Sequence, residues 1–109
     1  MLLFLYGTLL DAATLARHSG DPGLPRRLRP ARLEDFARTG LRGTPYPTLV
    51  PRPGATVAGA VLRAGPAARQ KLAAYEGADY RLVPVRVVTR RGPVRARAWV
   101  AARWRAEGV

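Results

Sequence analysis

The apolar run at residues 2–6, Leu-Leu-Phe-Leu-Tyr, constrains the fold more than any other feature of the chain. Consecutive large apolar side chains favour a strand that is covered on both faces, because alternate side chains of a strand point to opposite sides. We therefore expect this strand to be central in its sheet. Gly7 and Thr8 interrupt the run, and a short helix is predicted over residues 11–19, with Thr8 or Asp11 as its N-cap.

The rest of the chain contains more candidate strands than helices. Strands are predicted over residues 31–38, 48–50, 56–63, 82–89 and 94–101, and a second helix over residues 66–75. A turn at residues 51–54 separates the second of these strands from the third, in which Gly59 indicates a bulge or a close backbone approach. The last two strands form a hairpin around residues 91–93. Alternation puts Trp99 on the side of its second arm that meets water, and we expect it to be core or surface cover for a terminal strand. The pattern predicts one α+β domain, residues 1–109, in which a curled mixed sheet or small mixed β-barrel is flanked by short helices.

The residue types that are rare or missing in this chain exclude several kinds of catalytic and metal site. The chain has no Cys and no Asn, and its single His and single Ser are adjacent, at His18 and Ser19. A Ser-His-Asp triad is poorly supported, because its members have to converge from separate segments. His18 and the scattered carboxylates show no metal-ligand spacing, so we expect an exposed histidine at a helix end, no metal and no cofactor. Proton transfer would then fall to a carboxylate or a tyrosine.

The charge of the chain is strongly positive. There are 19 basic and 7 acidic residues, a formal net charge of +12, and Lys71 is the only lysine. Such a charge suggests a nucleic-acid partner. However, the arginines accompany many Ala, Gly and Pro residues, which is typical of a coding bias, and apart from Trp99 and Trp104 no aromatic side chains that could stack on bases lie among them. We do not expect a nucleic-acid partner. The apolar start is much shorter than the roughly 20 residues of a membrane span, and we expect a cytoplasmic protein without a membrane anchor.

Glu76 stands where helix chemistry disfavours a negative charge. It falls at the predicted end of the second helix, just before Gly77, where the negative end of the helix dipole opposes an anion. The helix terminus, apolar neighbours and burial would all raise the pKa of this carboxyl toward the range that suits general acid/base catalysis. In the alternative interpretation, Glu76 points into solvent and pairs with an arginine such as Arg81. Its position in the sequence leaves both interpretations open.

Three blocks of sequence together resemble the gamma-glutamylcyclotransferase-like family, also known as AIG2-like proteins. The blocks are LFLYGTLL at the start, YPTLVP with PG and VAGAVL in the middle, and LAAYEGADYR followed by VPVRVV toward the end. They occur in the family's order, and the resemblance extends from Leu3 to about Val100. It implies a gamma-glutamylcyclotransferase-like fold, which is a small mixed barrel flanked by helices with a pocket at its mouth.

The resemblance also implies a site and a reaction. In this family the Tyr-Gly-Thr-Leu loop binds substrate, and the Glu of the Glu-Gly pair is the acid/base residue. Carried over by position, the catalytic residue is Glu76 and the binding residues are Tyr6, Gly7, Thr8 and Leu9. The α-amine of a small-molecule γ-glutamyl substrate attacks its own γ-carbonyl, which closes 5-oxoproline and expels an amine. Because the nucleophile belongs to the substrate, no Ser, Cys or metal is needed. Backbone N–H groups of the loop could hold the α-carboxylate or the developing oxyanion.

Other residues of the predicted pocket are tyrosines. We expect Tyr80 to bind substrate, and Tyr46 and Tyr75 could also line the pocket. Ala101 stands where many relatives have a tyrosine, so one wall, near the leaving amine, is expected to differ. The alternative function is a non-catalytic binding module of the same fold, which uses the pocket or the basic surface for an acidic ligand or nucleic acid. The sequence predicts no oligomeric state.

Overall fold

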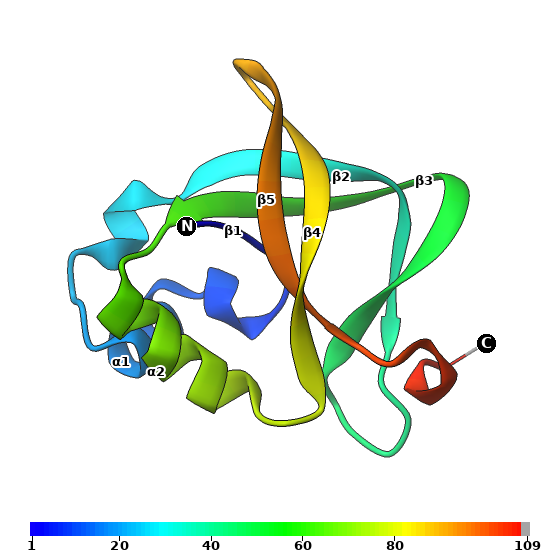
Figure 1. Ribbon diagram of the computed structural model, residues 1–109, viewed down its shortest axis with the longest axis horizontal. Coiled ribbons are helices and arrows are strands. Elements are labelled where there is room, and N and C mark those ends of the chain that lie inside the picture. The colour runs from blue at the N-terminus through cyan, green and yellow to red at the C-terminus, as the bar shows by residue number, and fades with distance from the viewer. Residues whose placement is uncertain (108–109) are drawn as a thin grey trace.

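Five strands form a closed barrel in the computed structural model, which describes residues 1–107 (Figure 1). The strands are β1 (Leu2–Leu5), β2 (Arg29–Gly40), β3 (Pro47–Arg63), β4 (Tyr80–Thr89) and β5 (Gly92–Ala101). Their order around the barrel is β1-β3-β2-β4-β5, and a parallel contact between Leu3 and Arg97 closes it, whereas the other pairings are antiparallel. The predicted mixed barrel is therefore confirmed.

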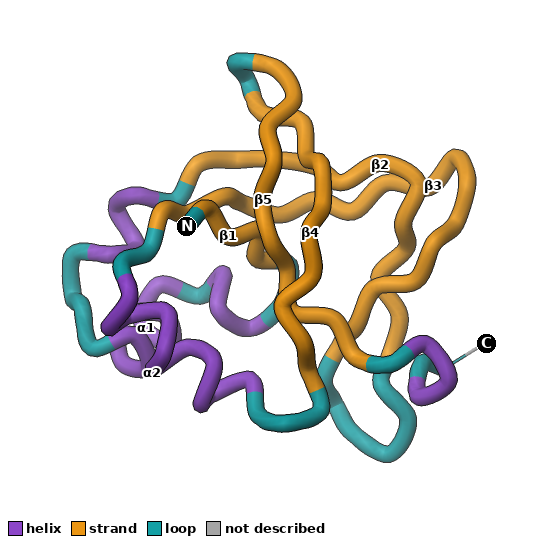
Figure 2. The backbone as a smooth tube through the Cα atoms, viewed as in Figure 1, coloured by secondary structure: helices purple, strands orange, loops and turns teal. Residues whose placement is uncertain are grey.

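Most of the helices lie together on one side of the barrel, whereas the last 3₁₀ helix, which follows β5, lies apart from them (Figure 2). They are α1 (Ala12–Ser19), α2 (Pro66–Glu76) and the short 3₁₀ helices η1 (Thr8–Leu10), η2 (Leu24–Arg27) and η3 (Arg103–Arg105). Asp11 caps α1 by accepting a 3.0 Å hydrogen bond from the Thr14 N–H, so Asp11 rather than Thr8 is the N-cap. In the described part of the chain, no helix is long and apolar enough to cross a membrane.

The β1 strand separates two apolar clusters, which explains its continuous apolar run. Phe4 and Tyr6 pack inside the barrel with residues of all the other strands. Leu3 and Leu5 point the other way, toward the helices, where they pack with Leu72 of α2. Both faces are covered, as the sequence predicts, and the end of β1 is held in place from two sides.

The predicted turn at residues 51–54 is wrong, because these residues lie within the single long strand β3. The β2–β3 register changes between Glu34, which pairs with Thr56, and Phe36, which pairs with Pro51. Residues 52–55 therefore form a bulge opposite Asp35, whose side chain accepts a 2.9 Å hydrogen bond from the Gly54 N–H. Prolines have no N–H to give to a ladder, and a bulge lets them lie within a bent strand instead of ending it.

The prediction of a close backbone approach at Gly59 is confirmed. A Cβ at this position would lie 2.3 Å from the carbonyl oxygen of Leu5 and 2.7 Å from the ring of Phe4. Glycine is needed here because β1 pairs with β3 as far as Leu5 and Ala60, and its end lies directly against Gly59 just before the chain enters the Gly7 loop.

Trp99 and His18 are more buried than their sequence context predicts. Arg95 and Arg97 are exposed on β5 as expected, but Trp99 is only 5% exposed because it packs with the outer apolar cluster against the helices. The His18 side chain is half-buried, and its ring centroid lies 4.1 Å from that of Tyr75. Alternation along a strand shows which residues share a face, but it does not show that helices cover that face.

Candidate active site

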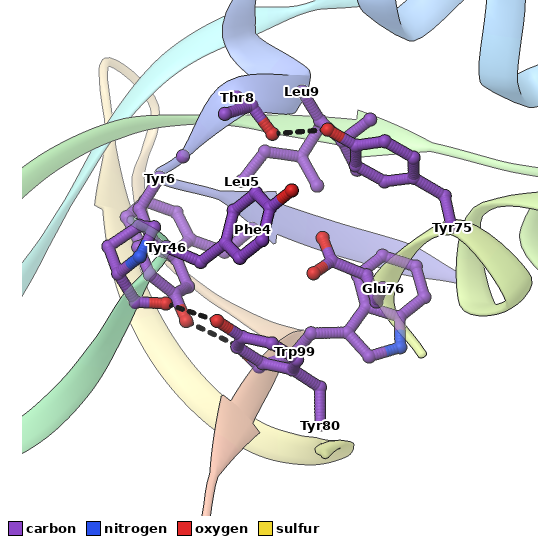
Figure 3. A pocket seen from close by; sticks show the side chains of 12 residues that line it. Phe4, Leu5, Tyr6, Thr8, Leu9, Tyr46, Tyr75, Glu76, Tyr80 and Trp99 are labelled. Carbon is purple, nitrogen blue, oxygen red and sulfur yellow. Dashed lines mark hydrogen bonds between the residues drawn. The ribbon is translucent and has the colours of Figure 1, made fainter. Parts of the chain in front are cut away.

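A pocket lies where the ends of several elements meet at one end of the barrel (Figure 3). Its volume is about 120 Å³, close to the roughly 150 Å³ of a cavity that holds benzene, so one small group fits rather than a whole peptide. All of the predicted site residues contribute to its lining, which consists of Phe4, Leu5, Tyr6, Gly7, Thr8, Leu9, Tyr46, Pro47, Tyr75, Glu76, Tyr80 and Trp99. Segments that lie far apart in the sequence therefore build one site.

Glu76 supplies the only carboxylate among these described lining residues, and it points into the pocket. It is the last residue of α2, which ends because Gly77 has a φ of 85°. Burial raises the pKa of the Glu76 carboxyl from 4.5 to about 7, because the charged form loses contact with water. At neutral pH, both protonation states are therefore substantially populated.

Glu76 makes no hydrogen bond or ion pair within residues 1–107. The ion pairs of this region join Arg32 to Glu34 and Arg105 to Asp79, and Arg81 is exposed. The alternative interpretation, in which Glu76 pairs with Arg81 in solvent, is therefore wrong. A half-buried carboxyl without a partner can exchange a proton with a bound ligand.

The hydroxyl groups of two tyrosines hold the walls of the pocket. The Tyr6 hydroxyl donates to the carbonyl of Trp99, and the Tyr80 hydroxyl donates to the carbonyl of Pro47 at 2.7 Å. Burial raises both phenol pKa values, and the charge of Glu76 adds to the effect, with that of Tyr80 reaching about 12. Both phenols therefore stay neutral at pH 7. The Tyr6 bond ties the residue after β1 to β5, and the Tyr80 bond ties the start of β4 to the start of β3.

The Gly7 loop places main-chain N–H groups at the pocket. η1 is closed by hydrogen bonds from the Leu10 N–H to Gly7 and from the Asp11 N–H to Thr8. The amides of Gly7, Thr8 and Leu9 themselves have no acceptor in the described part of the chain. Leu9 is 2% exposed, and its side chain belongs to the outer apolar cluster, so only its backbone is available for binding.

Thr8 connects this loop to the helix that carries Glu76. The Thr8 and Tyr75 hydroxyl oxygens lie 2.7 Å apart, within hydrogen-bond distance (Figure 3). Tyr75 immediately precedes Glu76, so the contact sets the spacing between the loop amides and the carboxylate. The sequence suggests each of these segments separately but not this contact between them.

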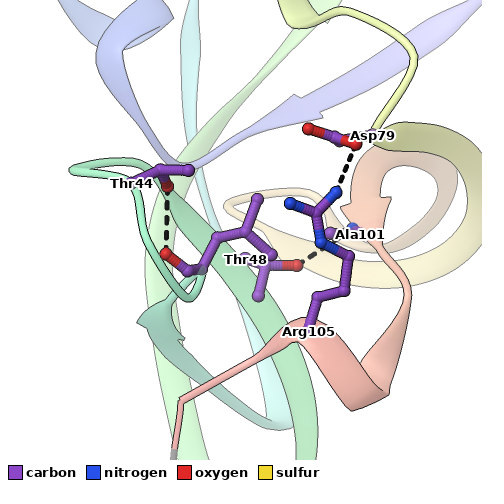
Figure 4. A network of polar contacts seen from close by, with 6 residues as sticks. Thr44, Thr48, Asp79, Ala101 and Arg105 are labelled. Atoms are coloured by element: carbon purple, nitrogen blue, oxygen red, sulfur yellow. Dashed lines mark hydrogen bonds and ion pairs between the residues drawn. The ribbon is translucent and has the colours of Figure 1, made fainter.

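The C-terminal segment supports the same end of the barrel (Figure 4). Arg105 of η3 forms an ion pair with Asp79, next to Tyr80, and its carbonyl accepts a 2.8 Å hydrogen bond from the Arg42 N–H. Ala101 is buried, and its N–H donates to the Thr48 hydroxyl at 3.0 Å. Ala101 does not belong to the pocket lining, and the expected difference from relatives in this wall stays a prediction.

Several pocket residues were missed from the sequence. In the sequence, Phe4 and Leu5 look like core residues, Pro47 looks like a loop residue, and alternation along the last strand puts Trp99 on the same side as the exposed arginines. The place of Trp99 in the pocket wall depends on how the helices pack against β5, which alternation along the strand does not show. No group of three His, Asp or Glu side chains suited to a metal ion occurs within residues 1–107.

Comparisons with known proteins agree with this architecture. The family model of "Gamma-glutamyl cyclotransferase, AIG2-like" matches residues 3–108. A solution structure from Arabidopsis thaliana is 29% identical with a TM-score of 0.77, over 92% of this chain and 61% of that one. A second Arabidopsis thaliana solution structure is 26% identical with a TM-score of 0.75, over 94% and 68%.

A structure named gamma-glutamyl cyclotransferase shares the fold at 22% identity, with a TM-score of 0.79 over 98% of this chain and 68% of that one. The chain thus spans 61% of the length of the first Arabidopsis structure and 68% of the other two. No curated protein matches the sequence.

Proposed function

Because the chain belongs to the gamma-glutamyl cyclotransferase, AIG2-like family, we propose that it cyclises a γ-glutamyl amine or peptide to 5-oxoproline and releases an amine. The observation that carries the proposal is the Glu76 carboxyl, which is half-buried, has no partner in the described chain, and has a pKa of about 7 beside a pocket for one small group. A base with this pKa is half ionised near neutral pH, where general acid/base catalysis is most effective.

In the proposed reaction, Glu76 acts first as a base and then as an acid. Its carboxylate accepts a proton from the substrate's α-ammonium group, and the neutral amine then attacks the γ-carbonyl carbon to form a tetrahedral oxyanion. The protonated Glu76 gives its proton to the nitrogen of the leaving amine as the C–N bond breaks. This transfer returns Glu76 to its ionised state, and the oxyanion reforms the carbonyl as the C–N bond breaks. The ring nitrogen then loses its second proton to the released amine, which leaves as an ammonium ion.

The pocket offers donors for the negative groups of such a substrate. The amides of Gly7, Thr8 and Leu9 are free of acceptors in the described chain, and no Arg or Lys belongs to the lining. We therefore assign the α-carboxylate or the developing oxyanion to these amides, which need no rearrangement during the reaction. Tyr6 and Tyr80 keep the walls in position through their bonds to Trp99 and Pro47.

The proposal is tested by measuring 5-oxoproline release from a panel of γ-glutamyl amines and dipeptides. The wild type is expected to release 5-oxoproline from at least one substrate, and Glu76→Gln to do so about 10²- to 10⁴-fold more slowly, the usual contribution of a general acid/base. Glu34→Gln is the matched control, because Glu34 is exposed on β2. No release from any substrate, or equal release by Glu76→Gln, would refute the assignment and favour a binding module.

A further inference from the structure

A second cavity lies at the opposite end of the β4–β5 hairpin from Glu76. Tyr80 and Ala101 pair at the end near Glu76, whereas Thr89 and Gly92 pair at the other end, where this cavity is found. Its volume is about 720 Å³, within the roughly 300–1,000 Å³ that small-molecule sites occupy. Nothing in the proposed reaction uses it.

The floor of this cavity is apolar. It includes Leu2 of β1, Val61 of β3, Val94 of β5 and Leu28, which precedes β2. Leu2 and Val94 are half-buried and pack against the cluster inside the barrel, so the edge of the core is open to solvent here. An apolar group placed on this floor would gain by leaving water.

The rim of the same cavity carries positive charge. Arg29, Arg90 and Arg91 all line it, and all three side chains are exposed. The guanidinium of Arg29 donates to the carbonyls of Arg26 and Leu28, both at 2.9 Å, which holds it beside the cavity. None of the three lining arginines has a carboxylate partner within residues 1–107.

The hairpin that forms one side of the cavity strengthens this positive field. Residues Tyr80–Ala101 include six arginines and no Asp or Glu. Arg86 and Arg95 are exposed and face each other directly across the strands, an arrangement of like charges that destabilises a sheet. The positive field of the hairpin would draw anions toward the cavity.

We propose that this cavity binds a single-chain aliphatic carboxylate. The chain lies on the floor formed by Leu2, Val61 and Val94, and the carboxylate meets the guanidinium groups at the rim, where arginine can bind both oxygens at once. A neutral hydrophobe would leave the arginines unused, and a small inorganic anion would leave the floor exposed. This site is separate from Glu76 and does not depend on the proposed reaction.

Calorimetric titration with three amphiphiles below their micelle concentrations tests the proposal. Decanoate is expected to bind with a stoichiometry of one, and at least about tenfold more tightly than hexanoate, because each buried methylene adds about two- to fourfold in affinity. Decyltrimethylammonium has the same chain with a positive head and is expected not to bind. Equal binding of the cation, or no saturable binding of decanoate, would overturn the proposal.

Two double variants locate the site. Arg90→Glu with Arg91→Glu reverses both charges in the hairpin turn and is expected to weaken decanoate binding at least about tenfold. Arg17→Glu with Arg52→Glu changes the net charge equally at exposed positions outside the cavity, and is expected to weaken it less than about threefold. Circular dichroism checks that both variants fold.

Equal losses in the two double variants would overturn the assignment of the site. A second outcome would also overturn the proposal. If decanoate does not bind but a single-stranded oligonucleotide does, and oligonucleotide binding is lost only in the Arg90→Glu, Arg91→Glu variant, the arginines form a surface for polyanions. Glu76→Gln is expected to bind decanoate like the wild type, so failure of the proposed reaction and failure of this site are observed separately.

Discussion

Replacing Glu76 with Gln should make the protein more stable at alkaline pH, because it removes a carboxylate that the fold disfavours. The pKa of the Glu76 carboxyl is raised from 4.5 to about 7 by burial, so the folded state binds its proton more tightly than the unfolded state. The wild type therefore loses stability as the pH rises from about 4.5 to about 7, with no further loss from this group above that range. Gln does not titrate and avoids this loss.

The size of the effect follows from the shift. Each pKa unit corresponds to 1.36 kcal/mol, so Glu76 lowers the unfolding free energy by about 3 kcal/mol between pH 4 and pH 8. For a domain of this size, the Tm advantage of Glu76→Gln at pH 8 should be roughly 10 °C. At pH 4, where Glu76 is neutral, the two proteins should differ little.

Denaturant unfolding of both proteins at pH 4, 6 and 8 measures this difference. Glu34→Gln is the control, because Glu34 is exposed and its ion pair with Arg32 should contribute less than about 1 kcal/mol. Parallel stability curves for the wild type and Glu76→Gln across this range would refute the reasoning, because burial would then not destabilise the ionised carboxyl. Such a result would also remove the main support for Glu76 as the acid/base group.

Three further changes have definite expected outcomes. If Glu76 is the base, kcat/KM should rise with pH and level off above about 7, and a profile flat from pH 5 to 8 would contradict this. Gly59→Ala should destabilise the fold by about 3 kcal/mol or more in denaturant unfolding, because its Cβ would overlap the Leu5 carbonyl, whereas Ala58→Gly, at an exposed neighbour, should have a much smaller effect. Tyr6→Phe should lower the unfolding free energy by about 1–3 kcal/mol by leaving the Trp99 carbonyl without its donor.

Local sequence patterns account for much of the fold. The central position of β1 follows from its uninterrupted apolar side chains. The start of α1 follows from the Asp11 cap, and the end of α2 follows from Gly77. The prediction of a turn at residues 51–54 is wrong because a proline shows only that its residue gives no N–H to a strand ladder. Both a turn and a bulge can accommodate such a residue. Only the partner strand, with Asp35 opposite the bulge, distinguishes the two.

The sequence by itself determined which residues could form the site, because the Tyr6–Leu9 segment, Glu76 and Tyr80 occur in recognisable blocks with local roles. Only the tertiary structure decided that they surround one pocket, that Trp99 forms part of its wall, and that Glu76 is half-buried without a partner in the described chain. The physical reason is that a pKa depends on desolvation and neighbouring charges. Both are set by segments that the barrel brings together from distant parts of the chain.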